Sequence, residues 1–164
     1  GKIIDTGTHR GGSSLALSYN KSNTVYTYDI EEYKGGIANN VRNVPDNIIS
    51  HCPHSILDLM RDDPDQILSS DIFFVDIDHD GSDEMQLFEF LLENKYTGML
   101  ILDDIHINCE MKKLWSDIID LDVISFDVTS IAHRMNNDGT GVIFIDKSHS
   151  LIEKIRELNE GLYE

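Results

Sequence analysis

The sequence predicts an α/β protein: a doubly wound sheet, mostly parallel, that ends in an antiparallel hairpin strand. Along most of the chain, short apolar and β-branched runs alternate with longer segments of helical periodicity, the pattern of repeated strand–helix units. The last two apolar runs follow each other with no helical pattern between them. Strands joined in that way are expected to be antiparallel.

Length and charge limit the possible functions. The chain has 164 residues, 40% of them hydrophobic, so one domain over residues 1–164 is expected to have its own core. The formal net charge is −17, and such an acidic surface repels nucleic-acid phosphates and anionic membranes. We therefore expect no nucleic-acid and no membrane partner. The charge is compatible with cation binding, although most acidic surfaces are simply well solvated.

Cysteine usage and hydropathy indicate a cytoplasmic protein. Cys52 and Cys109 have no paired spacing and are predicted to be free thiols. No apolar stretch approaches the ~20 residues of a membrane span, and no signal peptide is visible. The first motif begins only a few residues into the chain, which leaves open whether an N-terminal cap precedes it.

The predicted elements follow in a simple order. Strands are expected at residues 2–6, 24–29, 47–50, 71–75, 99–103, 123–128 and 141–145. Helices are expected at residues 13–19, 54–60, 82–96, 110–119 and 152–162. Ser13 and Ser55 are predicted helix N-caps, and residues 62–65 a solvated acidic turn. The apolar stripe with Trp115 at its centre is expected to pack in the core.

The first strand, turn and helix form a candidate ligand site. Glycines let the backbone approach a ligand closely, and the helix N-terminus offers free N–H groups. Asp29 ends the next strand, where a carboxylate can accept hydrogen bonds from both ribose hydroxyls. The spacing Asp-x-Gly-x-x-x-Gly-Gly is unlike the G-x-G-x-x-G that cradles a pyrophosphate, and Asp5 suits a ligand carrying an ammonium group. The predicted cofactor-binding residues are Asp5, Gly7, Thr8, Gly11, Gly12 and Asp29.

Two later strands run directly into carboxylates. Asp76, Asp78 and His79 follow the strand at 71–75, and Asp103 and Asp104 close the strand at 99–103. In an open α/β sheet both loops leave the carboxyl ends of their strands, where such sheets bind ligands. The two acidic clusters are therefore expected to meet at one site. The alternative is that these acids cap the following helices and bind nothing.

The element order and motifs resemble class I S-adenosylmethionine-dependent methyltransferases, whose fold is Rossmann-like. Residues 5–14 look like that family's first motif, and residues 25–29 look like its second. Residues 73–79 resemble the F-I-D-G-D-H strand of the sugar and antibiotic O-methyltransferases of the macrocin and cephalosporin-hydroxylase type, although Ile77 stands where that subgroup has glycine. Residues 102–104 resemble its paired-aspartate motif. A late D-x-T…G-T-G stretch, with His133 inside it, is also similar.

The resemblance implies a cofactor, a metal and a substrate class. The cofactor is S-adenosylmethionine, and the acceptor is a small hydroxylated molecule, a sugar or glycoside. Asp76, Asp103 and Asp104 are implied as ligands of Mg²⁺ or a similar cation, which lowers the pKa of a bound hydroxyl. Asp78 is the candidate general base, and His79 is the alternative because its ordinary pKa lies close to neutral. His106 and His133 are further candidates to line the site.

Two other functions are compatible with parts of the pattern. The chain could be a non-catalytic methyltransferase-fold module of a larger protein or assembly. A nicotinamide-dependent oxidoreductase would share the strand–turn–helix arrangement, but the absence of G-x-G-x-x-G argues against it. The sequence identifies neither the acceptor nor the hydroxyl that is methylated, and it is compatible with a homo-oligomer.

Overall fold

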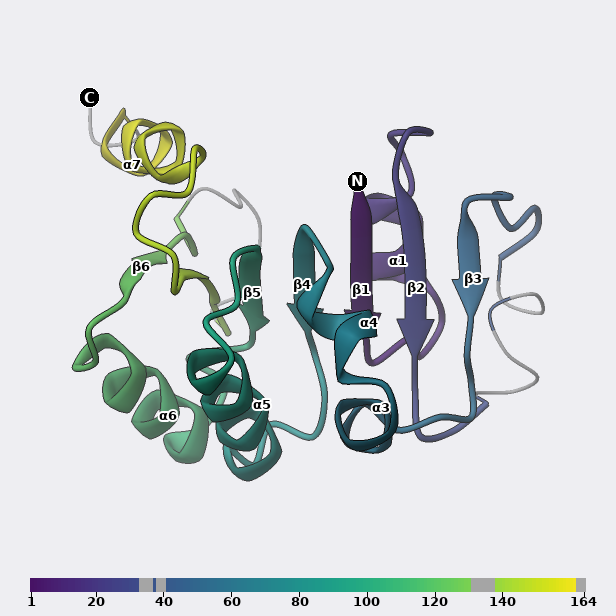
Figure 1. The fold of residues 1–164 in the computed structure, drawn as a ribbon, viewed down its shortest axis with the longest axis horizontal. Coiled ribbons are helices and arrows are strands. Elements are labelled where there is room, and N and C mark those ends of the chain that lie inside the picture. The colour runs from purple at the N-terminus through teal and green to yellow at the C-terminus, as the bar shows by residue number, and fades with distance from the viewer. Residues whose placement is uncertain (33–36, 38–40, 131–137, 162–164) are drawn as a thin grey trace. The chain divides into compact units, whose positions relative to one another are not determined.

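A computed structural model describes residues 1–32, 37, 41–130 and 138–161. The chain divides into two compact units, Gly1–Ile77 and Asp78–Glu164. Figure 1 shows the ribbon of both. The predicted fold class is confirmed: the described residues form seven strands, a parallel set followed by an antiparallel C-terminal set, together with helices.

The first unit is a parallel sheet with strand order β3-β2-β1-β4. Its elements are β1 (Lys2–Thr6), α1 (Gly12–Leu17), β2 (Thr24–Tyr28), β3 (Ile48–Ser50), α3 (Ile56–Asp62), α4 (Pro64–Leu68) and β4 (Ile72–Val75). In Figure 1, β1 lies between β2 and β4. Because these four strands run in the same direction, their carboxyl ends share one edge, where the predicted cofactor residues lie.

Apolar burial on both faces explains the continuous hydrophobic runs in these strands. One cluster joins Ile3, Val25, Ile37 and Ile48, and Phe73 of β4 is fully buried. Parallel strands covered on both faces are expected to show such runs instead of strict alternation. The exceptions are polar residues at the ends of β1 and β2, and these belong to the candidate site.

The second unit carries the antiparallel strands. Its elements are α5 (Ser82–Glu93), β5 (Met99–Asp103), α6 (Cys109–Ile119), β6 (Ile124–Asp127), β7 (Thr140–Phe144) and α7 (Ile152–Glu160). Strand β7 lies between β5 and β6 and runs antiparallel to both. The predicted antiparallel pairing of the last two strands is therefore confirmed.

Helix α6 buries the apolar stripe predicted for it, whereas α5 buries only part of its apolar face. Phe88 and Leu91 of α5 are buried, while Met85 and Leu92 are only partly covered. In α6 all four residues of the stripe are buried: Met111, Leu114, Trp115 and Ile118. Trp115 is therefore a core residue in this unit.

Two local predictions are wrong. The acidic stretch 62–65 is not a turn, because α4 begins at Pro64, a residue whose fixed φ suits the first position of a helix. Ser13 is not the N-cap of α1, because Gly11 holds that position and the hydroxyl of Ser13 bonds to Asp5 instead. Ser55 is confirmed as the N-cap of α3, since its hydroxyl accepts the Leu57 N–H at 3.1 Å.

Both cysteines are free thiols, as predicted. Within the described ranges, no helix combines the length and the apolar character that a bilayer crossing requires.

Gly141 is expected to be essential for packing β7 against Trp115. A Cβ built at Gly141 would lie 2.5 Å from Cζ3 of that buried ring. We expect Gly141→Ala to lower the free energy of unfolding by about 1–3 kcal/mol, the usual cost of overpacking a core. Urea unfolding measures this. Gly161→Ala is the control, because a Cβ there meets no atom of the described residues within 4 Å. Equal stability of the two variants would contradict the prediction.

Candidate functional site

Asp5 is the buried anchor of the first unit. Its side chain is fully buried in β1, and Oδ2 accepts hydrogen bonds from the hydroxyls of Ser13 at 3.2 Å, Thr27 at 3.0 Å and Ser14. Burial raises the pKa of the Asp5 carboxyl, and the nearby Asp76 adds to the increase, whereas the three hydroxyls oppose it. Among the described residues, Oδ1 of Asp5 has no hydrogen-bond partner.

A chain of hydroxyls extends from Asp5 to the glycine turn. Oγ1 of Thr27 lies 2.5 Å from Oγ1 of Thr8, which in turn accepts from Sγ of Cys52 at 3.2 Å. Each hydroxyl has only one proton, and that of Thr27 goes to Asp5. Thr8 must therefore donate to Thr27. The hydrogen bonds in this series of hydroxyls thus all donate in one direction, from Cys52 toward the Asp5 carboxylate. Thr8, a predicted cofactor-binding residue, is buried, and its hydroxyl belongs to this series of hydrogen bonds.

The requirement for glycine differs among the three glycines of the turn. Gly7 has φ 80°, and a Cβ there would lie 1.6 Å from the carbonyl oxygen of Asp76. Gly11 has φ 84°, and a Cβ there would lie 2.5 Å from Ile37. Both are therefore required by the protein's own backbone and core. A Cβ at Gly12 would meet none of the described residues within 4 Å, so these residues leave open space there.

Asp29 fixes the turn from the end of β2. Its Oδ2 accepts the His9 N–H at 2.8 Å, and its Oδ1 accepts the Glu31 N–H at 3.0 Å. A carboxylate has about four acceptor positions, so each oxygen retains capacity for a ligand hydroxyl. The turn is thus held by a carboxylate on either side, Asp5 and Asp29.

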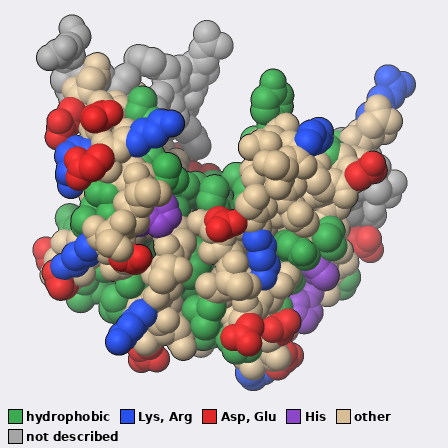
Figure 2. All heavy atoms as spheres, turned by 45° about the horizontal axis from the view of Figure 1, so that its top comes forward, with side chains coloured by type: hydrophobic (Ala, Val, Ile, Leu, Met, Phe, Trp, Pro, Cys, Tyr) green, Lys and Arg blue, Asp and Glu red, His purple; other side chains and the backbone are tan. Residues whose placement is uncertain are grey.

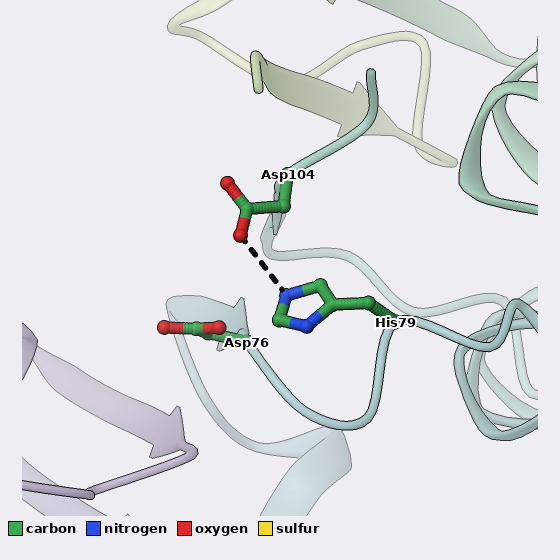
Figure 3. A group of neighbouring side chains, drawn as sticks. All are labelled: Asp76, His79 and Asp104. Atoms are coloured by element: carbon green, nitrogen blue, oxygen red, sulfur yellow. Dashed lines mark ion pairs between the residues drawn. The ribbon is translucent and has the colours of Figure 1, made fainter. Parts of the chain in front are cut away.

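The loop after β4 spans the boundary between the two units. Asp76 belongs to the first unit, whereas Asp78 and His79 belong to the second. Asp78 is exposed. His79 lies against Asp104, with its Nε2 3.3 Å from Oδ2, and both side chains are largely buried (Figure 3). The backbones of His79 and Asp104 have φ 58° and 56°, a left-handed conformation that is costly for residues other than glycine.

Asp103 begins a polar network around the ends of the antiparallel strands. Its Oδ1 accepts the Thr140 hydroxyl at 3.0 Å, and the Thr140 N–H donates to Thr129 at 3.2 Å. Thr129 donates to Asp127, which lies 2.8 Å from Nε2 of His106. Burial alone would raise the pKa of the Asp127 carboxyl, but the hydrogen bonds from Thr129 and His106 bring it below its usual value. The predicted His133 lies outside the described residues.

The sequence prediction missed the residues that hold the candidate residues in place. Ser14 and Thr27 bind Asp5, Glu84 binds the loop of His79, and Asn108 binds the His79 carbonyl. The paired serines at 13–14 directly after the glycines were the one available signal for the first group. For Glu84 and Asn108, only their position in the first turn of a helix or just before it was informative.

The raised pKa of Asp5 predicts a pH effect of known sign. Because the folded carboxyl binds its proton more tightly than the unfolded one, this stabilising contribution is present at low pH and is lost as the pH rises through the folded pKa. We therefore expect Asp5→Asn to gain stability relative to the unsubstituted protein as the pH rises above the ordinary carboxyl pKa of 3.8. A urea-unfolding series over pH measures the difference. Asp46→Asn, at an exposed acid, is the control, and a pH-independent difference for Asp5→Asn would contradict the prediction.

Comparisons with known proteins show which solved structures have a similar fold. No family model matches the sequence, and no curated protein matches it. Solved structures do match. A proposed caffeoyl-CoA O-methyltransferase from Staphylococcus aureus has a TM-score of 0.63 at 16% identity, over 87% of this chain and 75% of that one. An rRNA methylase from Streptococcus thermophilus has a TM-score of 0.55 at 14% identity, over 87% and 84%.

A third similar structure is a complex with SAH. Human methyltransferase-like protein 13, in complex with SAH, has a TM-score of 0.53 at 13% identity, over 99% of this chain and 80% of that one. At such low identity, the likeness concerns the fold alone. The chain has the Rossmann-like fold of the class I S-adenosylmethionine-dependent methyltransferases.

Proposed function

We propose that this chain is an S-adenosylmethionine-dependent O-methyltransferase that acts on a hydroxyl of a small molecule, a sugar or glycoside. The observation that carries the proposal is the glycine turn after β1, held between Asp5 and Asp29 in a fold that methyltransferases share. The narrower resemblance to sugar and antibiotic enzymes supplies the acceptor class.

The cofactor proposal rests on what the turn offers a ligand. A buried carboxylate oxygen without a donor is costly, so Oδ1 of Asp5 favours a ligand or water that brings an N–H or O–H group. The ammonium group of S-adenosylmethionine is such a donor. Asp29 has acceptor capacity for ribose hydroxyls, and the open space at Gly12 permits close approach of the backbone.

The net charge of the protein favours one class of acceptor over others. The whole sequence has a formal net charge of −17. On the face drawn in Figure 2, acidic side chains are scattered with lysines and arginines between them. Such a surface repels polyanions at long range. We therefore favour a neutral hydroxylated acceptor over RNA or a coenzyme A ester, the substrates that the names of two similar structures suggest.

Methyl transfer to oxygen requires an aligned acceptor and removal of its proton. We assign the removal of this hydroxyl proton to Asp78 or to His79, acting as general base. Asp76, Asp103 and Asp104 are proposed to hold a divalent cation, because carboxylate oxygens are the ligands that Mg²⁺ prefers. When bound, the cation would lower the pKa of the acceptor hydroxyl. The competing proposal is a non-catalytic module that binds the cofactor and serves a larger assembly.

Gly12→Ala is expected to weaken cofactor binding without lowering stability. A Cβ at this position contacts no atom of the described part of the chain, so a loss of affinity with unchanged stability reports contact with the ligand. Calorimetric titration with S-adenosylmethionine measures the affinity, and urea unfolding measures the stability. Gly161→Ala is the matched control, since it adds the same methyl group in equally open space. Unchanged affinity in Gly12→Ala would remove Gly12 from the binding site.

Asp78→Asn or His79→Asn is expected to abolish turnover while cofactor binding is retained. Loss of a general base costs on the order of 100-fold to 10,000-fold in rate. The assay is transfer of a labelled methyl group from S-adenosylmethionine to a panel of glycosides, with Mg²⁺ and with EDTA. Asp83→Asn, which removes a neighbouring acid, is the control. Full activity in one of the two variants would assign the base to the other residue.

The same assay separates the two proposals. Transfer to any hydroxylated acceptor would exclude the non-catalytic module. Cofactor binding with no transfer to any acceptor would favour the module, and no cofactor binding would overturn both.

A further inference from the structure

Glu84 binds the loop of the candidate base through both carboxylate oxygens. The side chain is buried in the first turn of α5. Its Oε2 accepts the Gly81 N–H at 3.0 Å, which is the usual bond of a capping box. Its Oε1 reaches two residues further back and accepts the His79 N–H at 2.8 Å. Capping of α5 does not require that second bond.

Asn108 binds the same residue from another helix. Its Oδ1 accepts the Met111 N–H at 2.8 Å and so caps α6. Its Nδ2 donates to the carbonyl oxygen of His79, also at 2.8 Å. Both backbone polar groups of His79 are therefore held by side chains that also cap helices, one from α5 and one from α6.

This double attachment accounts for the backbone conformation of His79. A histidine at φ 58° is strained, and such a conformation persists only where its surroundings enforce it. The backbone of Asp104 has φ 56°, and its Oδ2 lies 3.3 Å from Nε2 of the His79 imidazole. The hydrogen bonds of Glu84 and Asn108 thus set where the His79 side chain can point.

We propose that Glu84 and Asn108 are positioning residues for methyl transfer, which hold His79 in its left-handed conformation and thereby direct its imidazole at Asp104. The proposal rests on the proposed function, because it gives a catalytic purpose to a loop that carries a candidate base. Neither residue need contact the substrate. Their effect is expected in the catalytic step and not in cofactor binding.

Two substitutions isolate the positioning bonds. Asn108→Asp keeps the oxygen that caps α6 but removes the N–H donor to His79. Glu84→Gln keeps the size of the side chain but replaces one acceptor oxygen with a donor that faces a backbone N–H. The controls are Gln86→Glu, which adds the same charge at an exposed position of α5, and Glu93→Gln, which removes the same charge at the exposed end of α5.

In the full chain, we expect kcat to fall on the order of tenfold to 100-fold in each variant, the cost of a misplaced catalytic group. KM for S-adenosylmethionine is expected to change by less than about twofold, since the cofactor residues are elsewhere. Amide exchange at His79, followed by NMR, is expected to accelerate in Glu84→Gln. The two controls should match the unsubstituted protein in all three measurements.

The outcomes distinguish a failure of the positioning role from a failure of the proposed function. Exchange at His79 that is unchanged in Glu84→Gln would overturn the positioning role, whether or not the protein has activity. Accelerated exchange with unchanged kcat would also overturn it, since the conformation would not matter for turnover. A protein that transfers no methyl group to any acceptor would overturn the proposed function, and with it the catalytic purpose assigned to Glu84 and Asn108.

Discussion

The buried carboxylate of Asp5 is the interaction on which the first unit depends. Placing a charge in the middle of a parallel sheet is unfavourable unless hydrogen bonds replace the lost water. Here the donors come from α1 and β2, so satisfying the charge also fixes how that helix packs against those strands. The chain of hydroxyls then reaches Thr8 and Cys52, which extends the constraint to the glycine turn. The result is a glycine turn of one defined conformation.

The second unit uses helix capping in a similar way. Glu84 and Asn108 each cap a helix and each bind the backbone of His79. Helix N-termini present unsatisfied N–H groups near the loops that follow the strands, so side chains placed there are close to any site at that edge. A residue that is needed for folding can therefore also hold a site residue in position. The left-handed backbone of His79 marks where this occurs.

Much of the fold could be predicted because periodicity depends on burial. The strands near 2–6, 24–29 and 99–103 and the stripe of α6 were recognisable from their apolar patterns. Local errors arose where two rules competed. Ser13 has the chemistry of an N-cap, but its hydroxyl donates to the buried carboxyl of Asp5 instead. Residues 62–65 look like a solvated turn, although Pro64 equally suits the start of a helix.

The fold class, the glycine turn with its two carboxylates, and the strand-end acids could be predicted because they depend on residue type and spacing along the chain. Which polar groups meet could not, because that depends on the folded arrangement. The hydrogen bonds between Thr27 and Asp5 and between Glu84 and His79, and the close approach of His79 to Asp104, join residues whose spacing follows no local period. Their directions depend on side-chain geometry and on the need to satisfy buried polar groups, and both are set only when the chain is folded.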